Sequence, residues 1–274
     1  METVRRPRGR PREDKAPKSD LAKTNQSLEK ALGLLKALSA HDGMTLTDLS
    51  GAAGLPPSTV HRLLGTLGAH ELVSFDETTQ TWAIGIESLR IGMAFQRRNK
   101  ILLAGRPAMT SLMEATCETV NMAMLDRFQV VFVSQVECEA PIRAFFRIGE
   151  RRAAYASGIG KALLAHLPEA RLAAFLRSEK IVRLTDRTLC EAEALRTDLA
   201  LIRARGWSLD DEEATTGMRC IAAPIFNEYG EARAGISLSG PASRLTDERL
   251  DALGAQVKAA ADAISELIGG RLLA

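Results

Sequence analysis

The chain has 274 residues, which is the length of about two domains. Hydrophobic residues make up 46% and charged residues 26%, a globular balance that excludes a wholly disordered or fibrous chain. The net charge of +2 gives no overall basic character, so any attraction to nucleic acid must come from local clusters of cations. No apolar run approaches the roughly 18 residues of a membrane helix, and the basic N-terminus lacks the apolar segment of a secretory signal. We therefore expect a cytoplasmic protein without a membrane segment.

Residues 1–22 form a basic tail, rich in proline and arginine, that we expect to be disordered on its own. The sequence RPRGRP at 6–11 resembles an AT-hook core, in which Arg8 and Arg10 would enter a narrow A·T minor groove. A non-specific basic arm fits the same composition. Both interpretations predict attraction to nucleic acid, which the cation-poor residues 25–86 need from elsewhere.

Residues 45–67 have the pattern of two short helices joined by a tight turn. Thr45 and Asp48 predict a capping box for the first helix, Gly54 ends it, and Pro57 starts the second. The residues near the start of the second helix that point outward suit phosphates and base edges in a major groove: Pro57, Ser58, Thr59, His61 and Arg62. An ordinary helical hairpin with a solvated polar face is the alternative.

An amphipathic helix over 27–40, capped by Ser27, precedes this pair. Its expected apolar stripe consists of Leu28, Leu32, Leu35 and Leu38. Two strands, 72–75 and 81–84, follow the pair as a hairpin. Together these elements predict a winged helix-turn-helix DNA-binding domain over residues 23–86.

Residues 87–103 predict a linker helix with apolar side chains. A second subunit is the expected partner of these side chains, because paired DNA half-sites require a two-fold axis. Packing within the same chain is the alternative. From residue 104 to 274 helical and strand patterns alternate, with a capping box expected between Thr188 and Glu191 and a helix cap at Thr246.

Five segments that follow the helix-turn-helix carry a family resemblance. They are ETVNMAMLD at 118–126, ASGIGKALLA at 156–165, RARGWSLDDEE at 203–213, GMRCIAAPIF at 217–226 and ISLSGPASRLTDER at 236–249. In this order they resemble the IclR family of bacterial regulators, over nearly the whole chain after the tail. The resemblance implies an α+β protein with a GAF-like effector-binding domain over 104–274, and dimers that pair into tetramers on double-stranded promoter DNA. The NMAMLD, SLDDEE and MRC segments are also similar to those of a glyoxylate-responsive member.

The resemblance implies a pocket for a small carboxylate in the second domain. Backbone N–H groups of Gly158 and Ile159, before a helix, would bind the carboxylate, together with the hydroxyls of Ser237 and Ser239. At the other end lie Asp210 and Cys220, while the apolar wall consists of Ala144, Met218 and Ile236. Each of these residues also has an ordinary structural explanation, as turn glycine, strand hydroxyl, solvated acid or core side chain.

Asp210 favours an effector that donates a hydrogen bond to it, such as a 2-hydroxy acid or a 2-oxo acid like glyoxylate, whose aldehyde hydrates. The bulky segment around Pro141, Phe145 and Phe146 departs from the glyoxylate-responsive member. It keeps open a roomier pocket for an aromatic carboxylate.

The cysteines at 117, 138, 190 and 220 form no C-x-x-C pair and have no histidine at ligand spacing, so we expect no metal and no cofactor. The favoured function is a regulator of a carbon-metabolism operon that senses a small 2-oxo acid. Two rivals remain: a GAF-like thiol redox enzyme with Cys220 as nucleophile, and a DNA-architectural protein that responds to no small acid.

Overall fold

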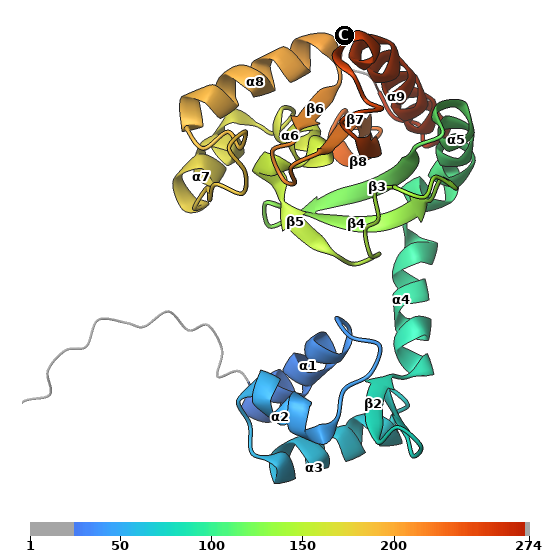
Figure 1. Cartoon of the computed structure of the whole chain (residues 1–274), viewed down its shortest axis with the longest axis vertical. Helices are drawn as coiled ribbons and strands as arrows, with labels where there is room; N and C mark the ends of the chain where they lie inside the picture. Colours follow the sequence, from blue (N-terminus) through green and yellow to red (C-terminus); the bar gives the residue numbers. More distant parts are fainter. Residues whose placement is uncertain (1–24, 272–274) are drawn as a thin grey trace, which may run out of the picture. The chain divides into compact units, whose positions relative to one another are not determined.

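The computed structural model describes residues 25–271, so Arg8 and Arg10 of the expected tail contact lie outside the described residues. The chain divides into two compact units, and the division falls between Ala94 and Phe95 (Figure 1). No helix within residues 25–271 is long and apolar enough to cross a membrane.

The first unit consists of three helices and a hairpin, as expected for a winged helix-turn-helix. The helices are α1 (Gln26–Leu38), α2 (Leu46–Ala53) and α3 (Pro57–Ala69), followed by the antiparallel strands β1 (Val73–Asp76) and β2 (Thr81–Ile84). The buried side chains of all three helices and of β1 meet in one apolar core: Leu34, Leu38, Met44, Leu49, Val60, Leu64, Leu67 and Val73.

Local capping agrees with the sequence at α2 and differs at α1. Asp48 N–H donates to Thr45 Oγ1 over 3.2 Å and Thr45 N–H donates to Asp48 Oδ2 over 3.4 Å, which confirms the capping box. At α1 the cap is Asn25, whose Oδ1 accepts from Ser27 N–H over 3.1 Å, so Ser27 as cap was wrong.

The predicted stripe of α1 was also partly wrong. Leu28 and Leu32 are 57% and 47% exposed, whereas Leu34 and Leu38 are buried. The fully buried residues of α1 lie in its C-terminal half, and Ala31 and Leu35 pack against the same core.

The segment expected as one linker helix is divided. Helix α4 (Ile86–Arg98) ends before Asn99, and α5 (Lys100–Thr116) begins directly after it. Ile101 and Leu102 already belong to the core of the second unit, three residues before the predicted domain start at 104.

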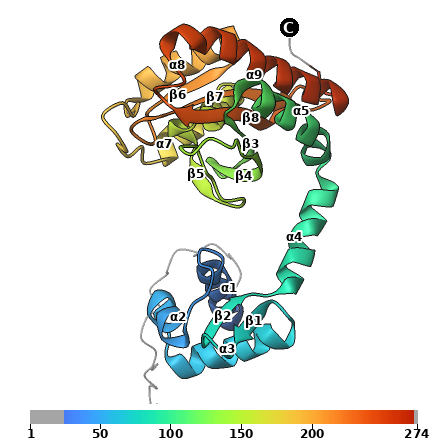
Figure 2. The ribbon, with the colours of Figure 1, turned by 45° about the vertical axis from the view of Figure 1, so that its right-hand side comes forward.

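The second unit is built on a six-stranded sheet in the order β5-β4-β3-β8-β7-β6, with every neighbouring pair antiparallel. The strands are β3 (Thr119–Asp126), β4 (Gln129–Val136), β5 (Arg151–Ala153), β6 (Ser208–Asp211), β7 (Met218–Phe226) and β8 (Ala232–Pro241). Helices α5 and α9 (Asp247–Leu267) cover one face (Figure 2). The short helix α6 (Gly158–Leu164), preceded by η1 (Ala154–Ala156), packs on the other face, with α7 (Glu169–Ser178) and α8 (Ala192–Arg205) beyond it.

The predicted capping box of Thr188 and Glu191 was wrong, whereas Thr246 occupies the predicted N-cap position of α9. Helix α8 begins at Ala192 without a side-chain cap, and the Thr188 hydroxyl instead donates to the Glu213 carbonyl over 2.8 Å. Thr246 precedes α9, but its side chain makes no capping hydrogen bond.

Candidate functional site

A row of polar side chains crosses four strands on the α6 side of the sheet. Strand register places Asp210 opposite Cys220, Cys220 opposite Ser239, and Ser239 opposite Thr119. Directly opposite residues point to the same face of a sheet, so the row forms a polar floor. Ser237 lies two residues from Ser239 along β8 and therefore shares this face.

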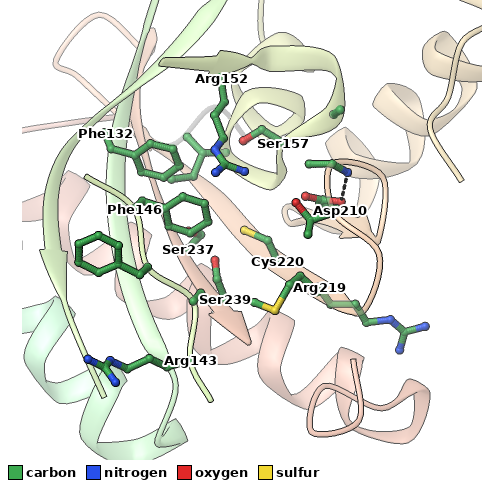
Figure 3. A pocket seen from close by; sticks show the side chains of 17 residues that line it. Phe132, Arg143, Phe146, Arg152, Ser157, Asp210, Arg219, Cys220, Ser237 and Ser239 are labelled. Carbon is green, nitrogen blue, oxygen red and sulfur yellow. Dashed lines mark hydrogen bonds between the residues drawn. The ribbon is translucent and has the colours of Figure 1, made fainter. Parts of the chain in front are cut away.

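A cavity of about 200 Å³ opens above this floor (Figure 3). We call it the effector cavity, and it is lined by Phe132, Arg143, Ala144, Phe145, Phe146, Arg152, Ala156, Ser157, Ile159, Asp210, Ala214, Thr215, Met218, Arg219, Cys220, Ser237 and Ser239. The lining comes from β4, the loop before β5, β5 itself, η1 and the start of α6, and from strands β6 to β8 with the turn between β6 and β7.

Seven of the nine residues expected in the pocket line this cavity: Ala144, Ile159, Asp210, Met218, Cys220, Ser237 and Ser239. Gly158 lies beside it, since a Cβ on Gly158 would come within 2.8 Å of Cys220 Sγ. Ile236, which was predicted to form part of the pocket wall, does not line the cavity. Its side chain lies on the opposite face of β8, in the core covered by α5 and α9, because neighbouring strand residues point to opposite faces.

Ser237 is the least satisfied polar group of the site. Its Oγ is buried, and within residues 25–271 it interacts only with the thiol of Cys220, a weak hydrogen-bonding group. The neighbouring Ser239 Oγ accepts from Asn121 Nδ2 over 3.5 Å, and Asn121 Oδ1 accepts in turn from Gln135 Nε2 over 2.9 Å. A buried hydroxyl with only a weak thiol partner costs free energy unless a stronger group bonds to it, so Ser237 points to a ligand with a polar group.

Asp210 is held by backbone rather than by cations. Its Oδ1 accepts from Glu213 N–H over 2.8 Å and from Ala214 N–H over 3.4 Å. Burial raises the pKa of Asp210 to about 6, against the lowering effect of these bonds. Burial, with a smaller contribution from Asp210, raises the pKa of Cys220 to about 11, so this thiol is protonated at neutral pH and is a poor nucleophile.

The start of α6 leaves two backbone amides ahead of the first intrahelical hydrogen bond. Lys161 N–H donates that bond to the Ser157 carbonyl over 2.8 Å, and Gly160 N–H donates to Ser157 Oγ over 3.4 Å. The N–H groups of Gly158 and Ile159 precede both donors, so helix geometry gives them no acceptor within α6.

The sequence did not single out the aromatic and cationic side of the cavity. The rings of Phe132 and Phe146 stack in parallel with centroids 4.5 Å apart. Arg152 Cζ lies 4.7 Å from the centre of the Phe146 ring. The bulk of Phe145 and Phe146 was the only sequence signal on this side, and nothing in the pattern marked Arg152.

The expected DNA-contacting residues lie together at the start of α3 in the first unit. Pro57, Ser58, His61 and Arg62 are exposed, and Thr59 is half-buried. Val60 and Leu64 point the other way into the core, which fixes the outward face of the helix.

Comparison with known proteins identifies both units. The family model described as the IclR helix-turn-helix domain matches residues 27–77, and the model described as the bacterial transcriptional regulator IclR C-terminal domain matches 93–266. The chain is 48% identical over 240 residues to the HTH-type transcriptional regulator BhcR of Paracoccus denitrificans, covering 88% of this chain and 86% of that protein. It is 40% identical over 248 residues to the transcriptional repressor IclR of Escherichia coli, covering 89% and 90%.

A solved structure shares the fold. The crystal structure of Thermotoga maritima IclR matches with a TM-score of 0.76 at 26% identity, covering 89% of this chain and 99% of that one. The relatives are named as transcriptional regulators, which excludes the thiol-enzyme interpretation of Cys220. The chain belongs to the IclR family of bacterial transcriptional regulators.

Proposed function

We propose that this regulator senses a small 2-oxo acid such as glyoxylate and thereby controls a carbon-metabolism operon. The observation that carries the proposal is Ser237, a buried hydroxyl that faces the effector cavity and has only the weak Cys220 thiol as a partner among the described residues. With Ser239 beside it and the amides of Gly158 and Ile159 near the same cavity, the chain offers several donors to one carboxylate.

The other end of the acid would meet Asp210 and Cys220. A hydrated aldehyde carries two O–H groups, and either can donate to the carboxylate of Asp210. Cys220, being protonated, can donate a weak S–H hydrogen bond. This arrangement favours a 2-oxo or 2-hydroxy acid over a plain carboxylic acid, which has no donor for Asp210.

The DNA-binding part of the proposal assigns residues 23–86 to the DNA-binding domain, 87–103 to the linker and 104–274 to the effector domain. Pro57, Ser58, Thr59, His61 and Arg62 would enter the major groove of a pseudo-palindromic promoter in the cytoplasm. The basic tail, through Arg8 and Arg10, would add phosphate and minor-groove contacts.

Assembly into dimers and tetramers is part of the same proposal. Helix α4 leaves several apolar side chains exposed, including Leu89, Ile91 and Phe95, which a second copy of the chain would cover. The effector acts through its different affinities for the DNA-binding and DNA-free states of this assembly. Light scattering of the protein with and without DNA tests the dimer and tetramer.

An aromatic carboxylate is the second candidate. The stacked pair Phe132–Phe146 gives the cavity an apolar wall onto which a ring could stack. The volume of about 200 Å³ also exceeds what the five heavy atoms of glyoxylate fill.

A DNA-binding titration on the protein's own upstream region tests the function, with glyoxylate, pyruvate or 4-hydroxybenzoate added. Release or tightening with the 2-oxo acids supports the proposal, and a response to 4-hydroxybenzoate alone supports the second candidate. A promoter affinity that no acid alters supports the DNA-architectural alternative. Ser237→Ala should weaken the response to the acid, whereas Ser178→Ala, at an exposed serine of α7, should not.

Two further variants test the DNA contacts. Arg62→Ala should weaken binding to the promoter more than binding to random DNA, with exposed Lys30→Ala of α1 as the control. Deletion of residues 1–20 should weaken both and reduce the salt dependence of binding. An unchanged salt dependence would remove the tail from the proposal.

A further inference from the structure

We propose that Arg152 is the cation that binds the effector's carboxylate and makes the cavity select acids over neutral molecules of the same shape. The inference rests on the proposed function, since it concerns how that cavity recognises a carboxylate. It adds a cation to a set of contacts that otherwise consists of hydroxyls, a thiol, the Asp210 carboxylate and backbone amides.

All three arginines that line the cavity are paired with a protein carboxylate, but they differ in where the guanidinium lies. Arg219 Nε lies 2.6 Å from Asp211 Oδ1, and its Nη1 lies 2.7 Å from Asp247 Oδ1. Arg143 Nε lies 3.0 Å from Glu137 Oε2. Figure 3 shows the Arg219 guanidinium directed away from the cysteine and serines of the floor. Arg219 is bonded to two carboxylates, and the Arg143 guanidinium lies apart from the cysteine and serines of the floor, whereas that of Arg152 lies beside Ser157 (Figure 3).

Arg152 uses only one of its three guanidinium nitrogens in hydrogen bonds among the described residues. Its Nε donates to Glu150 Oε1 over 2.8 Å, while its terminal nitrogens Nη1 and Nη2 have no hydrogen-bond partner within residues 25–271. The guanidinium lies against the Phe146 ring, which itself stacks on Phe132. The side chain is 35% exposed, as expected for a group at the mouth of a cavity.

The charge balance of the cavity explains why a cation is needed. Asp210 is in the lining and carries a negative charge above pH 6, so an acid that binds there brings a second negative charge into a partly desolvated space. Two like charges a few ångströms apart repel strongly when little water separates them. A guanidinium whose orientation is held by Glu150 and Phe146 offsets this repulsion and offers paired N–H donors that match a carboxylate.

Calorimetric titration of the full-length protein tests the proposal with glyoxylate and pyruvate, each paired with its primary amide. The amides keep the shape and the carbonyl but carry no charge. Arg152→Gln should raise the dissociation constants of both acids by roughly 10- to 100-fold, the range expected for loss of a charge-assisted hydrogen bond. It should change those of the amides by less than about 3-fold, and Arg152→Lys should recover part of the acid affinity.

Arg151→Gln is the matched control, because Arg151 precedes Arg152 on β5, pairs with the exposed Asp126 and is not among the residues that line the cavity. It should leave the dissociation constants of both acids and both amides unchanged. Equal weakening of acids and amides by Arg152→Gln would show a merely structural role and overturn the inference, as would an unchanged acid affinity. If the wild-type protein binds neither acid, the proposed function is wrong and the inference falls with it. If it binds the acids and Arg152→Gln binds them equally well, only the inference is wrong.

Discussion

Lys161 of α6 and Glu213 of the turn after β6 form an ion pair whose ammonium is only 1% exposed. The same ammonium lies 2.8 Å from Asp198 Oδ2 of α8. Lys161 is four residues from Ser157 at the cavity, and Glu213 N–H binds Asp210 at its other side. The buried pair therefore connects the two walls that carry the polar groups of the effector cavity.

Lys161→Met should destabilise the effector domain by about 3–5 kcal/mol, because it leaves buried carboxylates without their counter-charge. Lys161→Met combined with Glu213→Gln should be more stable than Lys161→Met alone, since one of those charges is then removed. Urea denaturation measures the free energy of unfolding of the single and the double variant. Arg196→Met, which breaks an exposed pair with Glu169, is the control and should cost less than about 1 kcal/mol. Equal stability of Lys161→Met and Arg196→Met would contradict the role of the buried pair.

Asp210 should make stability depend on pH. Its carboxyl keeps a proton in the folded protein up to about pH 6, whereas an aspartate in the unfolded chain loses it near pH 4. Between these values the folded state binds more protons than the unfolded state, so the free energy of unfolding falls as the pH rises through about 6. From pH 4 to pH 7 Asp210→Asn should lose less stability than the wild type, by on the order of 2 kcal/mol.

Asparagine at 210 keeps an oxygen that can accept from Glu213 N–H, so the substitution changes the charge more than the geometry. Asp186→Asn, at an exposed aspartate of the same unit, should retain the wild-type pH dependence. Parallel pH profiles of wild type and Asp210→Asn would show that this carboxyl titrates as it does in the unfolded chain.

Arg244 should hold the loop that carries Ala144, Phe145 and Phe146. Its guanidinium makes bonds of 2.5 and 2.8 Å to the buried carboxylate of Glu118, and its Nη2 donates to the Ile142 carbonyl over 2.9 Å. Arg244→Gln should speed amide hydrogen exchange across residues 142–148 and weaken effector binding several-fold.

Arg244→Gln alone also leaves the buried Glu118 charge unpaired, so the double variant Arg244→Gln with Glu118→Gln separates the two effects. The double variant should be more stable than Arg244→Gln, while amide hydrogen exchange across residues 142–148 should remain faster than in the wild type. Arg233→Gln, at an exposed arginine of β8, should alter neither property. Wild-type exchange in the double variant would mean that other contacts hold the loop.

Gly160 should tolerate no side chain. A Cβ there would lie 2.2 Å from the Ala154 carbonyl oxygen, which belongs to backbone and cannot move aside. Gly160→Ala should therefore cost about 1–3 kcal/mol or more, measured by thermal or urea unfolding. Gly33→Ala in α1, where nothing lies within 4 Å of the new methyl group, should stabilise by about 0.5–1 kcal/mol. A stable Gly160→Ala protein would show that α6 can shift away from η1.

Features set by neighbouring residues were predictable from the sequence, and those set by distant contacts were not. The Thr45–Asp48 capping box needs only its own turn, and it is present. The Thr188–Glu191 box failed because the Glu213 carbonyl, 25 residues away, takes the Thr188 hydroxyl.

The candidate site shows the same division. The resemblance pointed to Asp210, Cys220 and Ser239, but their alignment in one row depends on the register of strands that only the folded sheet defines. Ile236 could have been excluded from sequence, since a strand that points Ser237 into a cavity points its neighbour away. Arg152 gave no signal, because an arginine on a three-residue edge strand has no pattern that distinguishes it from a solvated one.

Alternate residues of β8 face either the effector cavity or the core covered by α5 and α9. Under the proposed function, changes at Ser237 and Ser239 would alter which molecule is recognised, while Ile236 and Leu238 remain in the core beneath α5 and α9. Under that proposal, effector preference would change through residues of one face of β8 while the core residues of the other face stay the same. A single inserted residue in β8 would instead exchange the two sets and abolish recognition and folding together.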